Sequence, residues 1–547
     1  MENDQMISCP NCGSNPRFDI ESQQLKCPNC GSLFDPATFP EETRGADSQT
    51  VTGDYAGQPD MMQVTIYTCS QCGGELMSTD SDATAFCSYC GSHQILEERL
   101  SQQKRPEHII PFKVTKEDCK KAYAARLRRS LFAPKELKDP AYIDEFRGIY
   151  MPYWFYDYRQ RGTVTLNGTR EHRSGNYRII DHYDLSAETD NFYGGISHDA
   201  STAMDDTISE SLAPYDISKS LKFRTPYLSG FYADIPDVKS NVYKRETTEM
   251  AARDALERVE ALKEFKGYSL GKISDSTAVT RTNTKLEKAS AAMLPVWFLS
   301  YRKNDRVAYA AINGQTGKLT ADIPIDHKKY ILAVGIMTLL IWVVLQFFNI
   351  SSLRSILFIN MYASMFGGLV YGMVVYKLQS NLNRQQWEKQ INRKREEPEA
   401  GDDEKDPVTK AKKKSELAEK RRQNPPGLLV SVIFLAVLLV INAVLSFFGM
   451  RIFVAAFPFV VAFYVSLGFS DTGYKRGIIS NWVLAVVTAL GALVWAVNPY
   501  VDELYFGSCI LMMGAIIWCF FDALFYYNQL MTRPLPQFQK TGGDDRA

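Results

Sequence analysis

The sequence predicts a multidomain membrane protein: two small four-cysteine modules, a duplicated α+β domain with helices on antiparallel sheet, and a C-terminal all-α membrane domain. Three observations predict this order. Eight of the 11 cysteines lie in the first 100 residues, an aromatic segment recurs in the middle of the chain, and long apolar stretches fill most of residues 330–530. A chain of 547 residues also exceeds the size of one domain.

The clustered cysteines follow one spacing twice, C-x2-C-x14-C-x2-C. The first copy is Cys9, Cys12, Cys27 and Cys30, and the second is Cys69, Cys72, Cys87 and Cys90. A Cys-x-x-Cys turn supplies two thiolates to a tetrahedral metal, and the glycine after each turn tolerates a positive φ. The pattern predicts two zinc ribbons, residues 1–40 and 63–100 with a 41–62 linker, each closed around one structural Zn²⁺. Mispaired ligands, or one site shared between the ribbons, are the alternative arrangement.

Disulfides and redox chemistry fit these cysteines less well than metal. The N-terminus has no basic region followed by an apolar core, so the cysteine-rich end is expected in the reducing cytoplasm. Cys119, Cys509 and Cys519 are isolated in the sequence. A thioredoxin-like function for a single Cys-x-x-Cys is disfavoured because the motifs come in matched pairs without a βαβ pattern.

The charge of the ribbons favours a protein partner over nucleic acid. Residues 1–100 carry four basic side chains, Arg17, Lys26, Arg44 and Arg99, against 15 Asp and Glu, so they would repel phosphate. A basic helix follows, with Lys120, Lys121, Arg126, Arg128 and Arg129. Three interpretations of that helix stay open: a solvated charged face, a contact with the acidic ribbons, and a contact with anionic membrane lipid.

Residues 106–329 read as two related α+β units. Residues 151–159 match residues 294–302 in Pro, Trp, Phe, Tyr and Arg, which indicates a duplication. An amphipathic helix precedes each copy, with apolar stripes Cys119, Tyr123, Leu127, Leu131 and Ala252, Leu256, Val259, Leu262. A hairpin follows each copy, at residues 162–171 with an Asn167-Gly168 turn and at 306–320 with an Asn313-Gly314 turn. Strand alternation in 153–156 predicts core packing on both faces.

Six apolar stretches predict about six membrane helices. They are residues 330–350 and 355–378, then 427–448, 452–469, 478–497 and 504–527. This divides the domain into two helices (330–378), a charged linker (379–426), four helices (427–530) and a tail (531–547). Lys and Arg concentrate in the linker and at Lys475-Arg476, so these loops and both termini are predicted to lie on the cytoplasmic side of a bacterial inner membrane.

Few polar residues occur inside the predicted spans. Ser364, Gly368 and Gly372 form a small-residue face that either intramolecular packing or a homo-oligomer could use. Asn360, Asn442 and Asp522 are the polar side chains of note. A transporter would be expected to show several intramembrane charges, so a transport pathway is the less favoured interpretation.

A set of motifs also resembles a known family. Besides the ribbons, these are Ile110-Pro111-Phe112 and residues 132–134, 148–154, 227–234 and 294–297. Together they resemble a largely uncharacterised bacterial family of zinc-ribbon-containing membrane proteins. The layout is similar to zinc-ribbon membrane anchors of envelope-stress systems. This implies a band-7/flotillin-like or phage-shock-type protein as partner, although this chain has a second ribbon and four more spans than the simplest such layout.

No enzyme signature stands out. The sequence has no phosphate-binding loop, H-E-x-x-H or G-x-S-x-G motif. The local clusters that could bind metal are Asp181, His182, Asp184 and His198, Asp199, Asp205, Asp206, for which a polar surface loop is the favoured interpretation. We therefore expect a non-enzymatic membrane adaptor. The alternatives are a transport or export component with a zinc-ribbon regulatory domain, and a nucleic-acid-binding ribbon protein.

Overall fold

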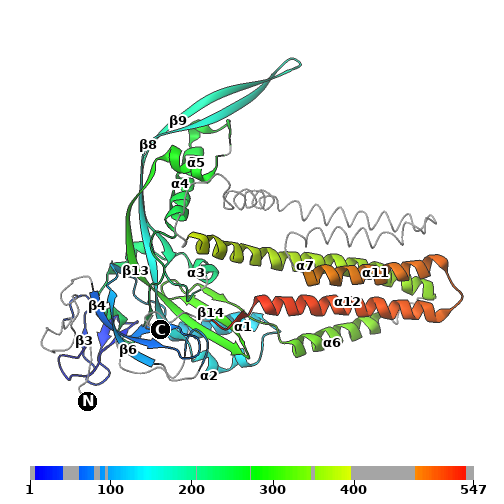
Figure 1. Ribbon diagram of the computed structural model, residues 1–547, viewed down its shortest axis with the longest axis horizontal. Coiled ribbons are helices and arrows are strands. Elements are labelled where there is room, and N and C mark those ends of the chain that lie inside the picture. Colours follow the sequence, from blue (N-terminus) through cyan, green and yellow to red (C-terminus); the bar gives the residue numbers. More distant parts are fainter. Residues whose placement is uncertain are drawn as a thin grey trace, which may run out of the picture. The chain divides into compact units, whose positions relative to one another are not determined.

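The computed structural model describes residues 7–40, 61–78, 87–92, 97–204, 206–271, 273–345, 352–395 and 475–536 (Figure 1). The chain forms two compact units. One comprises Met1–Ile323 with Thr532–Ala547 and is called the sheet unit below; the other comprises Pro324–Met531 and is called the helical unit.

The described part of the sheet unit holds two sheets. A small sheet carries β1 (Arg17–Asp19), β2 (Gln24–Lys26) and β3 (Leu33–Phe34). The 13-stranded sheet contains β4 (Met61–Thr68), β5 (Glu75–Ser78), β6 (Glu97–Lys104), β7 (His108–Ile109), β8 (Arg147–Ser174), β9 (Tyr177–Asp199), β10 (Leu221–Lys222), β11 (Tyr232–Asp234), β12 (Ser269–Leu270), β13 (Thr284–Lys303), β14 (Arg306–Asn313), β15 (Leu319–Ala321) and β16 (Arg533–Pro534). The helices of this unit are α1 (Lys116–Arg129), α2 (Pro140–Ile143), α3 (Asp206–Leu212), α4 (Lys244–Glu260) and α5 (Asp275–Thr282), with short 3-10 turns η1 (Glu136–Lys138), η2 (Ile217–Lys219), η3 (Thr225–Leu228) and η4 (Lys263–Phe265).

Strand pairing in the large sheet has the two-fold relation that a duplication produces. The two copies of the repeated segment lie on β8 and β13, which pair antiparallel, and the equivalent residues Met151 and Leu294 stand directly opposite each other. Each copy continues into a hairpin, β8–β9 or β13–β14. The short strand that begins each unit crosses over, so that β7 pairs parallel with β13 and β11 pairs parallel with β8. The two repeats therefore fold as one intertwined sheet.

The aromatic segment of the first repeat packs on both faces, as predicted. Tyr153 and Phe155 lie in one buried cluster, and Tyr156 lies in another, against Trp154. Each polar end is also satisfied: the Tyr153 hydroxyl lies 2.7 Å from Ser209 Oγ, and Trp154 Nε1 donates to the Val238 carbonyl at 2.8 Å. These contacts explain the segment as core.

The two amphipathic helices are present, but their apolar stripes are shorter than predicted. Cys119, Tyr123 and Leu127 are buried on α1, and Ala252, Leu256 and Val259 are buried on α4. The fourth residue of each stripe was assigned wrongly: Leu131 is 75% exposed and Leu262 is 38% exposed. Both follow the last turn, because α1 ends at Arg129 and α4 at Glu260, so the helical period no longer places them.

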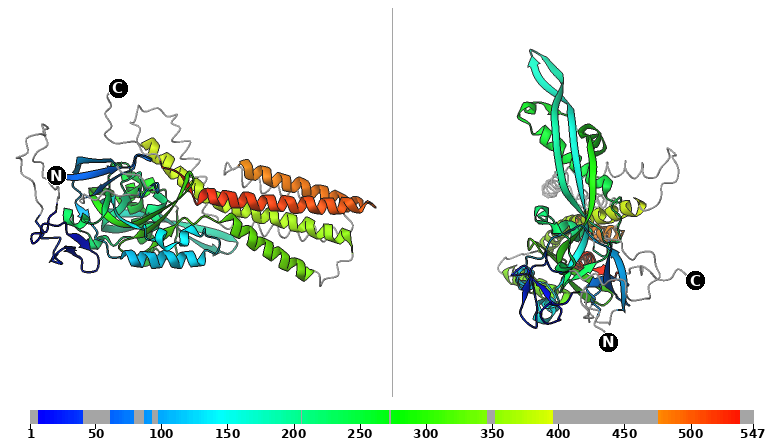
Figure 2. Two further views of the ribbon diagram at one scale, coloured as in Figure 1. Left: turned by 90° about the horizontal axis from the view of Figure 1, so that it is seen from below. Right: turned by 90° about the vertical axis from the view of Figure 1, so that its left-hand side faces the viewer.

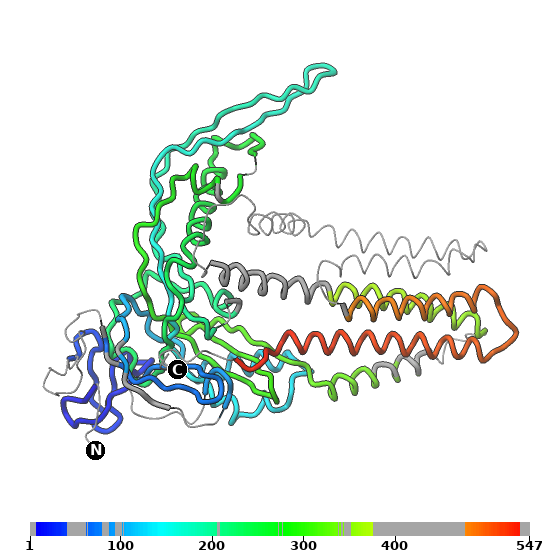
Figure 3. Tube along the Cα trace, in the orientation of Figure 1, coloured from blue at the N-terminus to red at the C-terminus, as the bar shows by residue number. Residues whose placement is uncertain are grey.

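The predicted turn at Asn167-Gly168 is wrong. Both residues lie within β8, opposite Asp184 and Tyr183, and the chain turns instead at Gly175 and Asn176 (Figure 3). Gly168 is needed for close packing there, because a Cβ would come within 2.7 Å of Leu185 Cδ1. The second predicted turn is confirmed: β14 and β15 pair antiparallel, and the Asn313 N–H donates to the Lys318 carbonyl across the turn.

The second cysteine module is part of the large sheet rather than a separate body. Its hairpin β4–β5 pairs through β5 with β11, and β6 pairs with β4 along its whole length. The sheet also takes in the predicted tail, since β16 pairs with β14. Arg306 and Arg533 add side-chain hydrogen bonds at that edge, to Thr532 and Asp322 respectively.

The helical unit contains four described helices, α6 (His327–Leu345), α7 (Leu353–Arg395), α11 (Lys475–Val497) and α12 (Asp502–Leu530). Among the described residues, three segments are long and apolar enough to cross a membrane: Leu353–Val375, Arg476–Val497 and Asp502–Leu530. The prediction of six is not supported. The stretches 427–448 and 452–469 lie outside the described residues, and α7 continues past the predicted end at 378 into the charged linker.

Helices α7, α11 and α12 pack side by side, as the left view of Figure 2 shows. The small-residue face of α7 is used within the chain: Ser364 Oγ lies 2.6 Å from Thr488 Oγ1, and Gly368 packs against Leu484. Asp522 is buried on α12. Its carboxylate lies 2.7 Å from Arg476 Nε on α11 and accepts a hydrogen bond from the Tyr371 hydroxyl on α7, so one polar group joins all three helices.

Candidate metal centres

The four Cys-x-x-Cys turns of the structure share one backbone geometry. In the first, the Gly13 N–H donates to the Cys9 carbonyl and the Cys9 N–H donates to the Ser14 carbonyl, both at 2.8 Å. The glycine that ends each turn has a positive φ between 68° and 74°, at Gly13, Gly31, Gly73 and Gly91. Only glycine adopts this conformation without strain, which is why the same residue closes every turn.

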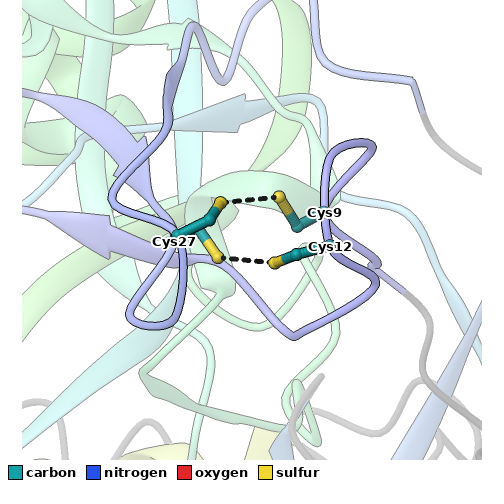
Figure 4. Close-up of side chains that lie close together, drawn as sticks. Cys9, Cys12 and Cys27 are labelled. Atoms are coloured by element: carbon teal, nitrogen blue, oxygen red, sulfur yellow. Dashed lines mark hydrogen bonds between the residues drawn. The ribbon is translucent and has the colours of Figure 1, made fainter.

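The first cluster brings together Cys9, Cys12, Cys27 and Cys30, from two turns joined by the β1–β2 hairpin. The Sγ atoms of Cys9 and Cys30 are 3.6 Å apart, and those of Cys12 and Cys27 are 3.4 Å apart. Figure 4 shows Cys9 and Cys12 on one turn facing Cys27 on the other. The structure thus pairs the ligands within one module, as predicted from the spacing.

The second cluster has the same plan. It consists of Cys69, Cys72, Cys87 and Cys90, with Sγ distances of 3.8 Å between Cys69 and Cys90 and 3.7 Å between Cys72 and Cys87. The Gly74 N–H donates to the Cys72 sulfur at 3.4 Å. Neither cluster borrows a ligand from the other, so the alternative of one shared site is not what the structure shows.

Both clusters fit a tetrahedral metal ion of zinc size. With Zn–S bonds of about 2.3 Å, the sulfurs at tetrahedral corners lie about 3.8 Å apart. All ligand atoms of each cluster lie within 4.8 Å of one another, and no position is left for a substrate in a four-thiolate set. Each cluster can therefore hold one ion in a closed, structural role.

The surrounding groups show why a cation suits these thiols. Backbone N–H groups, led by that of Cys30, lower the pKa of Cys27 to about 6, whereas burial raises the pKa of Cys9 to about 11. In the second cluster, the nearby thiols, first that of Cys69, raise the pKa of Cys87. Four crowded sulfurs cannot all ionise unaided, and a divalent ion removes this conflict.

The two clusters differ in their surroundings. In the first, Cys12 and Cys30 are exposed while Cys9 and Cys27 are buried; in the second, all four thiols are buried. The second cluster lies inside the sheet unit's core, where the Tyr309 hydroxyl donates to the Tyr89 carbonyl at 2.9 Å. The first is attached by its outer strands, for example through the Phe18 N–H, which donates to the Ser229 carbonyl. One site is peripheral and the other is built in.

The histidine and aspartate clusters singled out from the sequence do not form a metal site in the described part of the chain. Asp181, His182 and Asp184 lie along β9, and Asp181 pairs with His172 across the hairpin at 3.3 Å. His198 lies 3.0 Å from its neighbour Asp199, whose carboxylate raises the pKa of His198 although burial opposes it. Asp206 begins α3, and Asp205 lies outside the described residues.

One buried acid, Asp234, was not predicted from the sequence. Asp234, at the end of β11, is 3% exposed and accepts a hydrogen bond from the Ser201 hydroxyl. Burial raises the pKa of Asp234 to about 7. The sequence signal was present, because Asp234 follows the alternating Tyr232-Ala233, but an acid after a short strand also fits a solvated turn.

Comparison with known proteins adds one relative of unknown function. Over 241 residues the chain is 29% identical to "Uncharacterized protein YdjG" of Bacillus subtilis (strain 168). The aligned region covers 43% of this chain and 68% of the relative. No protein-family model matches the chain. No solved structure matches it either.

Proposed function

We propose that this protein is a non-enzymatic adaptor of the bacterial inner membrane, in which a zinc-held ribbon on the cytoplasmic side recruits a protein partner. Both four-thiol clusters are closed, which supports a structural role for zinc. The membrane-spanning candidates of the helical unit supply an anchor. A band-7/flotillin-like or phage-shock-type protein is the partner class that the sequence resemblance implies.

The observation that carries the proposal is the contrast between the two ribbons. In the first ribbon, both turns expose every residue between the cysteines: Pro10, Asn11, Pro28 and Asn29. Leu33 beside them is 51% exposed. In the second ribbon, Ser88 and Tyr89 are buried against the sheet and Gln71 is half-buried, so only Ser70 is exposed between the cysteines. The first ribbon therefore offers a binding face, whereas the second supports the platform.

Co-purification of the full-length protein from bacterial membranes in mild detergent tests this role. Leu33→Glu should remove a specific partner while zinc content stays at two ions per chain, because Leu33 is no ligand. The double variant Cys9→Ser/Cys12→Ser should remove the partner together with one ion. Met250→Glu is the matched control, since Met250 is 54% exposed on α4, away from the ribbon. If the partner stays bound to both ribbon variants, the adaptor proposal is wrong.

A second function is favoured by one feature of the helical unit. Asp522 is buried within a candidate membrane span and ion-paired with Arg476, and buried charges in such segments often mark an ion or substrate pathway. A transport or export role predicts that Asp522→Asn abolishes activity without loss of assembly. A structural role predicts destabilised packing of α7, α11 and α12 in detergent instead.

A further inference from the structure

The charges of α1 are distributed unevenly along the helix. In its first half, two cations have acidic partners: Lys120 pairs with Glu117 at 2.6 Å and also with Asp144, and Lys121 lies 3.5 Å from Asp118. Its second half and the following turn differ. Residues 126–138 carry the cations Arg126, Arg128, Arg129, Lys135 and Lys138 against the single acid Glu136. We call these five cations, together with Leu131, the α1 basic end.

The cations of the α1 basic end face solvent together. Each is exposed, and none forms an ion pair with any residue in the described part of the chain. The segment is nevertheless held firmly, because Leu127, Ala133 and Leu137 are each 1–2% exposed within one core cluster. Between these buried anchors, Leu131 projects with 75% of its surface exposed. An exposed apolar side chain therefore lies in a short segment of the chain that carries five exposed cations.

Two simpler explanations account for only part of this pattern. Cations in the last turn stabilise a helix through its dipole, which suits Arg126, Arg128 and Arg129. That effect does not extend to Lys135 and Lys138 beyond the helix end, or to Leu131. A contact with the acidic ribbons, left open by the sequence, is not observed among the described residues.

The sheet unit is joined covalently to a candidate membrane span. Leu530, the last residue of a candidate membrane span, is followed after two residues by β16, which pairs with β14. Helix α1 packs in the same core cluster as Ala308 and Ala310 of β14. A chain with candidate membrane spans has anionic phospholipid available as a ligand for a basic surface.

We infer that the α1 basic end binds anionic phospholipid at the membrane surface. The arginines and lysines would contact headgroup phosphates, and Leu131 would enter the interface between headgroups and acyl chains. Arginine suits this role because its guanidinium matches the geometry of phosphate oxygens. The inference does not depend on the proposed partner.

Site-specific photo-cross-linking of the full-length protein tests the inference. The photoreactive residue p-benzoylphenylalanine replaces Leu131, and the protein is reconstituted in nanodiscs of phosphatidylcholine, with or without phosphatidylglycerol. After irradiation, mass spectrometry measures phospholipid attached to residue 131. We expect an adduct that is about five-fold more abundant with phosphatidylglycerol and that decreases in high salt, because salt screens these contacts.

Two triple variants make the test specific. Arg126→Gln/Arg128→Gln/Arg129→Gln should remove most of the adduct. Lys239→Gln/Lys263→Gln/Lys266→Gln removes the same charge from exposed positions elsewhere on the sheet unit and should leave the adduct unchanged. Zinc content and circular dichroism confirm that each variant is folded. No adduct at residue 131, an adduct indifferent to phosphatidylglycerol, or equal effects of the two triple variants would overturn the inference.

Discussion

At the scale of single residues, the two thiol clusters are chemically alike but differ in access. Cys12 and Cys30 are exposed, whereas all four thiols of the second cluster are buried. A chelator can reach the first site directly, but the second only after local opening of the sheet. We expect metal release in two phases of one ion each, with the second at least about ten-fold slower. Release by excess EDTA, followed with a zinc-sensitive dye, measures both phases.

Two cysteine variants assign the phases. Cys12→Ser should remove the fast phase and leave the sheet unit folded. Cys72→Ser should remove the slow phase and lower the melting temperature clearly, because its cluster belongs to the core of the sheet. A single phase of two ions would contradict the difference in burial.

Asp234 should make the stability of the folded protein depend on pH. Its folded pKa of about 7 is above that of an unfolded aspartate, so between about pH 4 and 7 the folded state keeps a proton that the unfolded state has lost. Stability contributed by this group is therefore lost as pH rises from about 4 to 7, by at most about 1.4 kcal/mol per pH unit, and no more is lost above the folded pKa. Asp234→Asn should remove that loss.

Melting temperatures at pH 6 and pH 8.5 measure the effect of Asp234→Asn. The stabilising effect of the variant should be larger at the higher pH, and both values lie in a range where zinc stays bound to thiolates. Asp190→Asn serves as control because Asp190 is exposed on β9. An equal effect of Asp234→Asn at both pH values would show that Asp234 is ionised when folded.

At the scale of elements, the β8–β9 hairpin has a supported base and an exposed tip (Figure 1). Val164 and Leu166 are each 1% exposed in a cluster with α4 and α5, whereas every residue of β8 beyond Thr169 is exposed. Replacing residues 170–181 by Asn-Gly joins the paired residues Thr169 and His182 through a turn of the same length. We expect a change in stability below about 1 kcal/mol, measured by urea denaturation.

A deeper truncation is the matched control for the hairpin. Joining Gly162 to its partner Thr189 by the same Asn-Gly turn removes Val164 and Leu166 from their cluster. Loss of such buried side chains should destabilise the sheet unit by at least about 3 kcal/mol. If both truncations are equally harmful, the tip has a structural role that its exposure does not suggest.

At the scale of the whole molecule, connectivity limits the topology of the membrane domain. The chain leaves the sheet unit at Ile323 and returns to it at Thr532, so we predict that both ends of the helical unit lie on one side of the membrane. This topology predicts an even number of crossings, so the three candidate spans among the described residues would need at least one more. The predicted stretch 330–350, part of which α6 covers, is tested for this role, although α6 is not among the three candidates. With α6 and α7 both crossing, Ser352 and Tyr500 lie on the side opposite the sheet unit.

Thiol labelling in intact cells tests this topology. A membrane-impermeant maleimide should react with Ser352→Cys and Tyr500→Cys from outside, and with Ala547→Cys only after permeabilisation, because the basic loops predict a cytoplasmic sheet unit. Cys12 and Cys30, the exposed native thiols, lie on the inner side in this topology. Labelling of Tyr500→Cys but not Ser352→Cys from outside would show that α6 does not cross.

Local chemistry made much of the protein predictable. Each thiol cluster joins turns only 14 residues apart, so spacing alone assigned the ligands. The repeated segment predicted the pair of strands β8 and β13, and the apolar stretches predicted the three candidate spans. The turn at Asn167-Gly168 was mispredicted because packing of Gly168 against Leu185 and Tyr268 overrides a local turn preference.

The sequence by itself determined the grouping of eight cysteines into two sets of four, the duplication, and the division into a polar N-terminal part and an apolar C-terminal part, because each depends on residues close in the chain or on composition. Tertiary structure decided the exchange of β7 and β11 between repeats, the burial of Asp234 and the difference in exposure between the two clusters. These properties arise where segments distant in sequence pack together. Those contacts decide which side chains are buried and which strands pair. The same Cys-x-x-Cys turn is therefore partly exposed in the first module and buried in the second.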